Sequence, residues 1–423
     1  MKRFARYSFI LVCSMGLSLA MPISSWAQAK AQQKQEAEKV TSEPSLSTEQ
    51  AAAATTQAPG SPDNGQSKNG ELVIAPYPIS SPALGTGLQW VVGYVFRMNK
   101  EDKLTPPSFF GTVGMYTSNG SWGALVGGSF HLKQDKYRVV AGIADGNVNW
   151  DFYGVGKLAG ARGLFLPINI KGKGFGAQTL VRIAKHVYLG PRFQLRQMNA
   201  GIDFSHLKSR GLPEENDQLR ADIVAAVAGL LSTRTVAIGP HLQRDTRDDT
   251  FYPTGGTILN VGGDFFLKAL GSKFDYQVYQ VRFEGYHGLS ERQVLAFGAL
   301  GCAAAGDRVP FYDLCLYGAR NYVRGYTAGR FQDRRMWATQ AEYRVQLPKL
   351  LGIGLTERLG VVGFGGVGWV GKQLSDMAFD DLLPGGGAGL RFRLTKKYPI
   401  NFRIDYGIGR VGHTLSMGVG EAF

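Results

Sequence analysis

Alternation of apolar and polar residues over ten or more positions is the feature that most limits what this chain can fold into. From Trp337 to Leu347 the odd positions are mostly apolar, while the even positions include Gln340, Glu342 and Arg344. The same alternation recurs in three further segments, 187–196, 259–268 and 400–409. Successive side chains of a strand point to opposite faces, so each segment predicts a strand with one apolar and one polar face.

The length of these segments separates two kinds of all-β fold. Strands in a soluble sandwich are usually about five or six residues long. The segments here run to about ten residues or more, which is the length a tilted strand needs to cross a bilayer. Because only a closed barrel satisfies every backbone group in lipid, we expect an antiparallel transmembrane β-barrel.

Turn signals allow the strands to be counted. Short connections are indicated at 118–121, 144–147, 184–186, 252–256, 288–291 and 395–399. Together they predict sixteen strands, the first from Thr86 to Arg97 and the last from Gly412 to Phe423. An even number is typical of single-chain bacterial barrels. The count depends on 144–147, without which the strands would have to be redistributed.

The N-terminal part of the chain predicts export to the bacterial outer membrane. Residues 1–27 combine a basic start, an apolar stretch and small residues before the expected cleavage point, as in a signal peptide. Residues 28–70 contain almost no large apolar side chains, so we expect a disordered linker there. The barrel is expected to occupy residues 71–423.

Charge and composition argue against several functional classes. The net charge of +14 suggests nucleic-acid binding as one possible function. However, no Lys/Arg run follows residue 27, and an exported chain would not meet nucleic acid. The six histidines are dispersed, so no metal site is expected. No catalytic constellation is found, and we expect neither an enzyme nor a cofactor. The segment "GFGGVG" at 363–368 matches the Gly-x-Gly-x-x-Gly dinucleotide motif, but strand-like sequence follows it where that motif needs a helix. Its glycines instead indicate relief of crowding in the wall.

The last residues resemble a barrel-insertion signal. Leu415, Met417 and Val419 alternate with small or polar residues, and the aromatic Phe423 follows. Glu421 breaks the apolar pattern, so it is expected at the polar interface of the membrane.

Four ordered motifs then resemble the BamA/TamA surface-antigen superfamily. They are the loop "GDRVPFYDLCLYGARNYVRGY" from Gly306, the hairpin "DTRDDTFYPTGG" from Asp245, the strand "QAEYRVQLP" and the ending "GEAF". The resemblance places the loop, the sixth of its family, between the eleventh and twelfth strands. It also implies that this loop folds back into the barrel lumen.

The tip of this loop carries the expected site. It consists of Val323, Arg324, Gly325 and Tyr326. An arginine in a narrow lumen needs an acidic partner, and Glu342 faces inward on the following strand. The family's next strand offers an aspartate in a Phe-x-Asp-x-Gly pattern, but glycine stands in its place at position 366. Arg324 is therefore expected to pair with Glu342, either alone or together with Asp405.

The hairpin motif is expected at the periplasmic end of the barrel. Its family pattern falls on Asp245, Arg247, Asp248, Pro253 and Gly256. The aspartates could suggest calcium, but their spacing is not that of an EF-hand. Turn capping and local ion pairing are favoured.

Cys302 and Cys315 flank the start of the loop and are candidates for a disulfide, although sequence spacing does not fix their geometry. Inward-facing arginines also predict a basic lumen. They are Arg182, Arg192, Arg196, Arg282, Arg344, Arg391, Arg393 and Arg403.

Three functions remain open. The resemblance implies insertion, assembly or translocation of proteins through a lateral seam between the first and last strands. The expected partners are outer-membrane lipid, lipopolysaccharide and client outer-membrane or secreted polypeptides. Residues 28–70 are too short and polar to form a POTRA module. This leaves three alternatives: dependence on a separate periplasmic partner, a narrow client, or a reduced role. The alternatives are a loop-plugged pore for small anionic solutes and a structural surface barrel.

Overall fold

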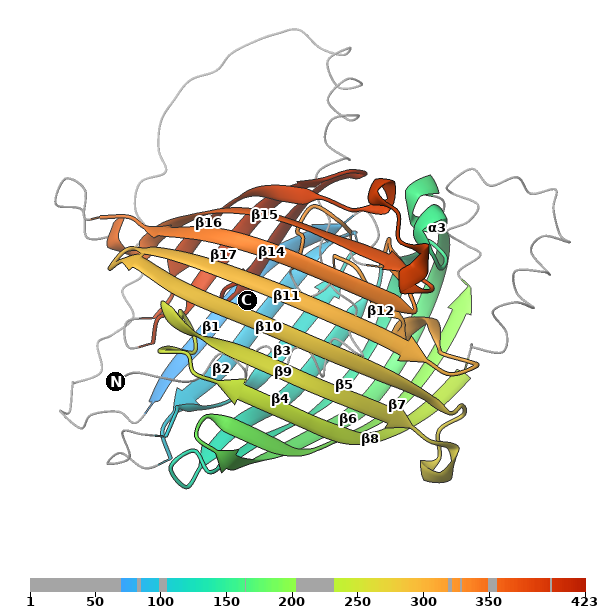
Figure 1. Cartoon of the computed structure of the whole chain (residues 1–423), viewed down its shortest axis with the longest axis horizontal. Coiled ribbons are helices and arrows are strands. Elements are labelled where there is room, and N and C mark those ends of the chain that lie inside the picture. Colours follow the sequence, from blue (N-terminus) through green and yellow to red (C-terminus); the bar gives the residue numbers. More distant parts are fainter. Residues whose placement is uncertain are drawn as a thin grey trace, which may run out of the picture.

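A computed structural model describes nine stretches of the chain: 70–81, 85–98, 105–163, 165–202, 232–318, 322–327, 329–348, 356–395 and 398–423. The signal peptide predicted at 1–27 and the linker predicted at 28–70 lie outside these residues, apart from Gly70. Figure 1 shows the described part as a β-barrel with short helical segments at one end.

Sixteen antiparallel strands form one continuous sheet. They are β1 (Gly70–Ser81), β2 (Gly85–Phe96), β3 (Ser108–Thr117), β4 (Trp122–Leu132), β5 (Tyr137–Phe152), β6 (Leu166–Ala184), β7 (Val187–Ile202), β8 (Ser232–Asp245), β9 (Gly255–Phe266), β10 (Tyr276–Ser290), β11 (Gln293–Ala305), β14 (Arg335–Gln346), β15 (Leu359–Gly371), β16 (Gly385–Arg393), β17 (Asn401–Gly409) and β18 (Gly412–Val419).

The remaining elements are short and lie in connections. The loop between β11 and β14 contains a small sheet of β12 (Cys315–Leu316) and β13 (Gln332–Asp333). One α-helix, α3 (Lys157–Arg162), follows β5. The described 3-10 helices are η1 (Lys268–Leu270), η2 (Phe311–Asp313), η4 (Thr356–Arg358), η5 (Leu374–Asp376) and η6 (Phe379–Asp381). None of the helices in the described residues has the length and apolar character to cross a membrane.

The predicted count of sixteen is correct, but two of its parts are wrong. The segment 86–97 largely forms the second strand, because β1 precedes it. Pro76 and Pro78 lie inside β1 and hide its strand signal, since proline is depleted in strands. The hairpin predicted at 144–147 does not exist, because β5 continues through these residues and pairs with β6 along its whole length. The missed strand lowers the predicted strand count by one and the false hairpin raises it by one, so the total remains sixteen.

Side chains sort between the two faces of the wall as the alternation predicts. In β14, Gln340, Glu342 and Arg344 are buried, whereas Ala341 and Tyr343 are exposed on the outer face. The two longest connections, 203–231 and 306–334, leave the same end of the barrel. Long loops are extracellular in such barrels, so this end is extracellular and the 246–254 hairpin is periplasmic.

Candidate functional site: the luminal lock and the seam

The loop between β11 and β14 places Arg324 inside the barrel, where it contacts two carboxylates. Its Nη1 donates to Asp405 Oδ2 at 2.7 Å, and its Nη2 donates to Glu342 Oε1. All three residues are buried: Arg324 is 4% exposed, Asp405 0% and Glu342 1%. The guanidinium also stacks 3.6 Å from the ring centroid of Phe364. The structure thus brings together both acidic partners that the sequence left as alternatives, and we call this group the luminal lock.

Asp405 supplies a second carboxylate to Arg324, although this chain lacks the aspartate that the family pattern places at position 366. Gly366 stands where the family has aspartate, whereas Asp405 reaches Arg324 from β17. Asp405 also accepts hydrogen bonds from Arg391 Nη1 at 2.6 Å and Arg403 Nη1 at 2.8 Å. Glu342 accepts from Arg344 Nε at 2.8 Å. Buried charges need such partners, and the lock therefore belongs to a larger network on the inner wall.

Glycines of β16 and β17 provide the space that the loop tip occupies. A Cβ on Gly407 would lie 2.7 Å from the backbone carbon of Arg324, and one on Gly409 would lie 2.7 Å from the Tyr326 ring. Gly325 itself has φ of 124°, a conformation that favours glycine. The tip therefore packs directly on the backbone of the wall.

This packing makes Gly407→Ala a sensitive test of the loop position. Overpacking of this kind costs about 1–3 kcal/mol, so we expect the loop tip to shift and trypsin to cleave faster after Arg324 or Arg330. Gly363→Ala is the matched control, because a Cβ at this β15 glycine meets nothing within 4 Å. Equal cleavage rates in the two variants would contradict this placement of the tip.

Tyr326 fixes the extracellular side of the tip. Its hydroxyl donates to the Pro384 carbonyl at 2.6 Å and accepts from the Arg410 amide at 2.9 Å. Burial raises the pKa of Tyr326, which keeps the hydroxyl protonated as a donor. The ring packs edge-on against Tyr317 and Phe331 of the same loop. Val323 is fully buried beside it.

Carboxylates neutralise much of the basic lumen that the sequence predicted. Arg192 pairs with Asp264, Arg196 with Asp313, and Arg282 with Glu284. Arg182 lies at the periplasmic rim rather than deep in the lumen: it is exposed there and donates to the Gln134 carbonyl, while its register partner Tyr188 is buried. Alternation in the sequence indicates which arginines face inward, but it does not indicate partners that are distant in sequence, such as Asp264 of β9 for Arg192 and Asp313 of the loop for Arg196.

The residues after β18 turn into the lumen, which corrects two predictions. The last strand ends at Val419 rather than Phe423, because Gly420 adopts φ of 90° and redirects the chain. Glu421 is buried and accepts from Arg391 Nε at 2.6 Å, so it does not lie at the membrane interface. Phe423 stacks on Tyr322 of the loop with ring centroids 5.5 Å apart. Leu415, Met417 and Val419 remain half-buried on the outer face.

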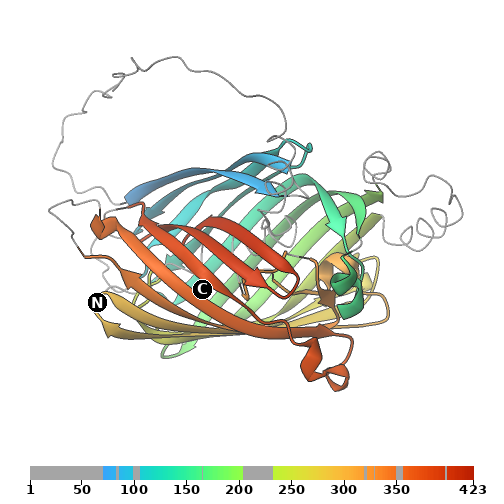
Figure 2. The same cartoon turned by 90° about the horizontal axis from the view of Figure 1, so that it is seen from above.

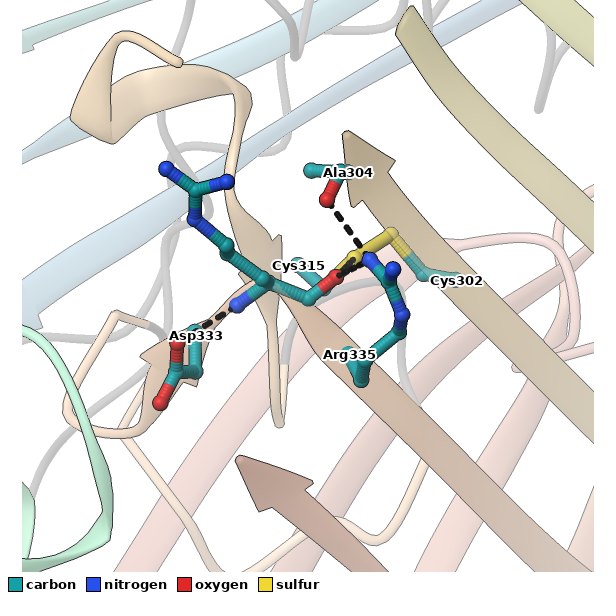
Figure 3. The surroundings of a disulfide bond; sticks show 6 residues. Cys302, Ala304, Cys315, Asp333 and Arg335 are labelled. Atoms are coloured by element: carbon teal, nitrogen blue, oxygen red, sulfur yellow. Dashed lines mark hydrogen bonds between the residues drawn. A yellow bond between two sulfur atoms is a disulfide. The ribbon is translucent and has the colours of Figure 1, made fainter. Parts of the chain in front are cut away.

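A disulfide anchors the loop to the wall. Cys302 of β11 and Cys315 of β12 are joined, with their Cα atoms 5.7 Å apart. Figure 3 shows this bond beside Arg335, whose Nη1 donates to the Ala304 carbonyl at 2.6 Å. The entry of the loop is therefore fixed to β11 independently of the lock at its tip.

The hairpin motif forms a capped turn at the periplasmic end. Asp245 accepts from Arg247 Nε at 2.9 Å and Nη2 at 3.0 Å. Asp248 accepts from the Thr254 amide at 2.9 Å, across the turn that contains Pro253. Gly256 has φ of 89°, and a Cβ there would lie 2.2 Å from the Thr246 carbonyl.

Sequence reasoning missed a second buried charge cluster beside this hairpin. Arg138 of β5 donates to both oxygens of Asp135, at 2.9 and 2.6 Å, and to Asp245 at 3.3 Å. Burial alone would raise the pKa of Asp135, but Arg138 and His131 hold it well below its usual value. Asp135 lies in a turn whose residues 133–135 all have positive φ. The ion pair with Arg138, together with the contacts of His131 and Tyr188 with the same carboxylate, stabilises this strained turn. No local motif in the sequence indicates it.

The first and last strands approach each other without a backbone ladder. Every other neighbouring pair of wall strands is hydrogen-bonded, but β1 and β18 stand at the two ends of the strand order. Figure 2 shows β1 in blue next to the red C-terminal strands. Side chains bridge the gap: Tyr77 and Phe402 lie with ring centroids 5.6 Å apart, and Met417 and Val419 pack against the buried face of β1. We call this junction the seam.

Two prolines lie in β1, the strand that forms one side of the seam. Proline has no N–H, and elsewhere in this wall it interrupts pairing: the β6–β7 register has a gap at Pro191, and the β8–β9 register has one at Pro240. In contrast, the β1–β2 register is continuous across Pro76 and Pro78. The donors missing at these two positions therefore face β18, which leaves the seam edge of β1 poor in donors.

Taken together, these features define an outer-membrane β-barrel with an extracellular loop locked in its lumen and one unpaired seam. The Omp85 superfamily domain matches residues 126–423, and the chain therefore belongs to the Omp85 superfamily. This finding confirms the family predicted from the motifs. Members of the superfamily are outer-membrane transporters and insertases that handle client polypeptides, not enzymes.

Solved structures agree on the fold. BamA from Haemophilus ducreyi lacking POTRA domains 1–3 is 13% identical, with a TM-score of 0.50 over 83% of this chain and 70% of that chain. CdiB from Escherichia coli is 12% identical, with a TM-score of 0.53 over 84% of this chain and 67% of that one. A search of curated proteins found no significant match.

Proposed function

We propose that this barrel inserts or translocates polypeptides at the outer membrane through the seam between β1 and β18. The observation that carries the proposal is the unpaired junction in a wall whose other neighbouring strands are all hydrogen-bonded to each other. An exposed strand edge can accept a further strand by β-augmentation. Within the described residues the seam is held by side-chain packing and by side-chain hydrogen bonds, such as the one from the Tyr398 amide to Glu71 Oε2 at 3.3 Å, without a backbone ladder. It therefore opens at a lower cost than any other junction.

The chemistry of the two edges favours β18 as the strand to which a client is added. The seam edge of β1 lacks donors at Pro76 and Pro78, so a client strand cannot form a continuous ladder there. No proline occurs in Gly412–Val419, and its free edge keeps every backbone donor. The luminal lock contributes by fixing the inner wall next to this edge, since Asp405 of β17 is one of its two carboxylates.

A seam cross-link tests the proposal. Cysteines in place of Tyr77 and Phe402 would be joined by a short bifunctional maleimide, and the native cysteines are protected by their disulfide. The matched control joins cysteines in place of Phe283 and Phe297, whose ring centroids are 6.4 Å apart on the paired strands β10 and β11. In cells that depend on the variant, the outer-membrane proteome should lose client proteins after the seam cross-link and remain unchanged after the control.

Two results would count against the proposal. An unchanged proteome after complete seam cross-linking would exclude a lateral route. Anion-selective conductance that persists in planar bilayers with the seam cross-linked would instead favour the solute pore. The neutralised arginines of the lumen argue against that alternative, because a pore selective for anions needs unpaired positive charge.

The predicted insertion signal and periplasmic partner extend this proposal. Leu415, Met417, Val419 and Phe423 would be read before the barrel folds, since Phe423 is buried in the folded state. A partner that delivers clients would bind the periplasmic end, where the hairpin of residues 245–256 lies.

A further inference from the structure

A polar patch lies on the outer wall of the barrel, where an apolar surface is expected. In β6 the outward residues Phe175 and Ile183 are exposed to lipid, with exposed fractions of 39% and 58%. Two and four residues beyond Phe175, toward the extracellular end, Lys173 and Lys171 occupy the same face and are also exposed. The wall therefore changes from apolar to basic at the extracellular boundary of the lipid-facing band.

Neighbouring strands extend this patch. Lys173 pairs in register with Gln197 of β7, which pairs with Arg234 of β8. Lys171 pairs with Asn199, which pairs with Ser232. All of these positions face outward, because each lies an even number of residues from a lipid-facing residue of its own strand. Adjacent strands lie about 4.8 Å apart, which places Lys173 and Arg234 roughly 10 Å from each other.

The patch carries excess positive charge. Asp145 of β5 lies opposite Lys173 and is the one carboxylate in these two rows. Within the described part of the chain, Lys171, Lys173 and Arg234 form no ion pair. Lys273 adds a further cation, since its Nζ donates to the Ser232 carbonyl at 2.8 Å. The amides of Gln197 and Asn199 supply further hydrogen-bonding groups between the cations.

We propose that this patch binds the phosphorylated headgroup of an outer-leaflet glycolipid, lipopolysaccharide. Three features select this occupant: the patch faces the membrane, it begins where the apolar band ends, and Lys171, Lys173 and Arg234 make no ion pair with any residue that the structure describes. Phosphate is the anionic group present at this depth, and basic residues beside an anionic headgroup surface attract it. The site lies on the wall of β5 to β8 (Figure 1), and it does not rest on the proposed role of the seam.

The test is binding of purified lipopolysaccharide to the full chain in detergent micelles, measured by microscale thermophoresis. The variant Lys171→Gln/Lys173→Gln/Arg234→Gln should bind roughly 150-fold more weakly, because each of the three basic residues contributes about five-fold. The control Arg182→Gln/Lys185→Gln/Arg244→Gln removes three exposed cations at the opposite ends of the same strands. It should bind within about two-fold of wild type. Folding of each variant is checked by its heat-modifiable gel mobility.

Phosphate dependence separates headgroup recognition from general adhesion. Lipopolysaccharide stripped of its phosphates should bind wild type as weakly as the intact lipid binds the patch variant. Wild-type affinity of the patch variant would overturn the proposal. So would equal weakening of the patch and control variants, or equal affinity of wild type for intact and dephosphorylated lipid.

Discussion

Replacing Arg324 with alanine is expected to release the loop from the lumen and to lower the free energy of unfolding by about 3 kcal/mol. Removing one partner of a buried ion pair costs about 3–5 kcal/mol, and the lower end applies because Glu342 and Asp405 keep other arginine partners. Urea unfolding in lipid vesicles measures the stability, and trypsin cleavage of the loop measures its release. We also expect at least a ten-fold loss of client assembly.

Two further variants show whether the effect belongs to the lock. Arg324→Lys should recover less than half of the lost stability, because lysine lacks the planar fork that reaches both carboxylates. Arg334→Ala removes another arginine of the same loop, whose Nη atoms donate to the carbonyls of Gly306 and Asp307. That control should leave the tip protected from trypsin. If the loop of Arg324→Ala resists trypsin as well as that of wild type, and client assembly is unchanged, Arg324 acts only as a solvated loop charge.

Restoring the missing donors of β1 is expected to close the seam. In Pro76→Val/Pro78→Val, two new N–H groups face β18, and valine also favours strand conformation. A ladder between β1 and β18 should then form, raise the thermal unfolding temperature and reduce client assembly at least ten-fold. Thermal unfolding followed by circular dichroism and the outer-membrane proteome provide the two readouts.

Pro191→Val is the matched control for this experiment. It restores a donor at the gap in the β6–β7 register, far from the seam. It should therefore leave client assembly unchanged. A double variant of β1 with unaltered stability and full activity would show that prolines do not keep the seam open.

Much of the fold was predictable because period-two alternation is local. The strand at 337–347 places Glu342 inside and Tyr343 outside as the sequence indicates. Errors arose where local signals conflict with the ladder. Pro76 and Pro78 suggest a break, yet β1 pairs fully with β2. The turn-like residues 144–147 lie in β5, where the wall continues beyond the lipid band and tolerates polar residues on its outer face.

The site was predictable only in part because its partners are distant in sequence. Arg324 and Glu342 lie on adjacent elements, so alternation and burial cost were enough to connect them. Asp405 comes from a strand 81 positions later and remained an alternative until the register placed it. Gly407 and Gly409 offered no sign that a loop tip packs on them. The inward path of Glu421 and Phe423 follows from one backbone angle at Gly420, which alternation cannot foresee.

Amide hydrogen exchange in lipid nanodiscs tests the central claim most directly, because it reads the backbone pairing of the seam itself. In β18, about half of the amides point away from β17, since pairing alternates along an antiparallel edge strand. We predict that these amides of residues 412–419 exchange at least 100-fold faster than those of residues 293–305 in β11, which pairs on both sides. Uniformly slow exchange along β18, matching β11, would mean that the barrel is sealed and would contradict the account.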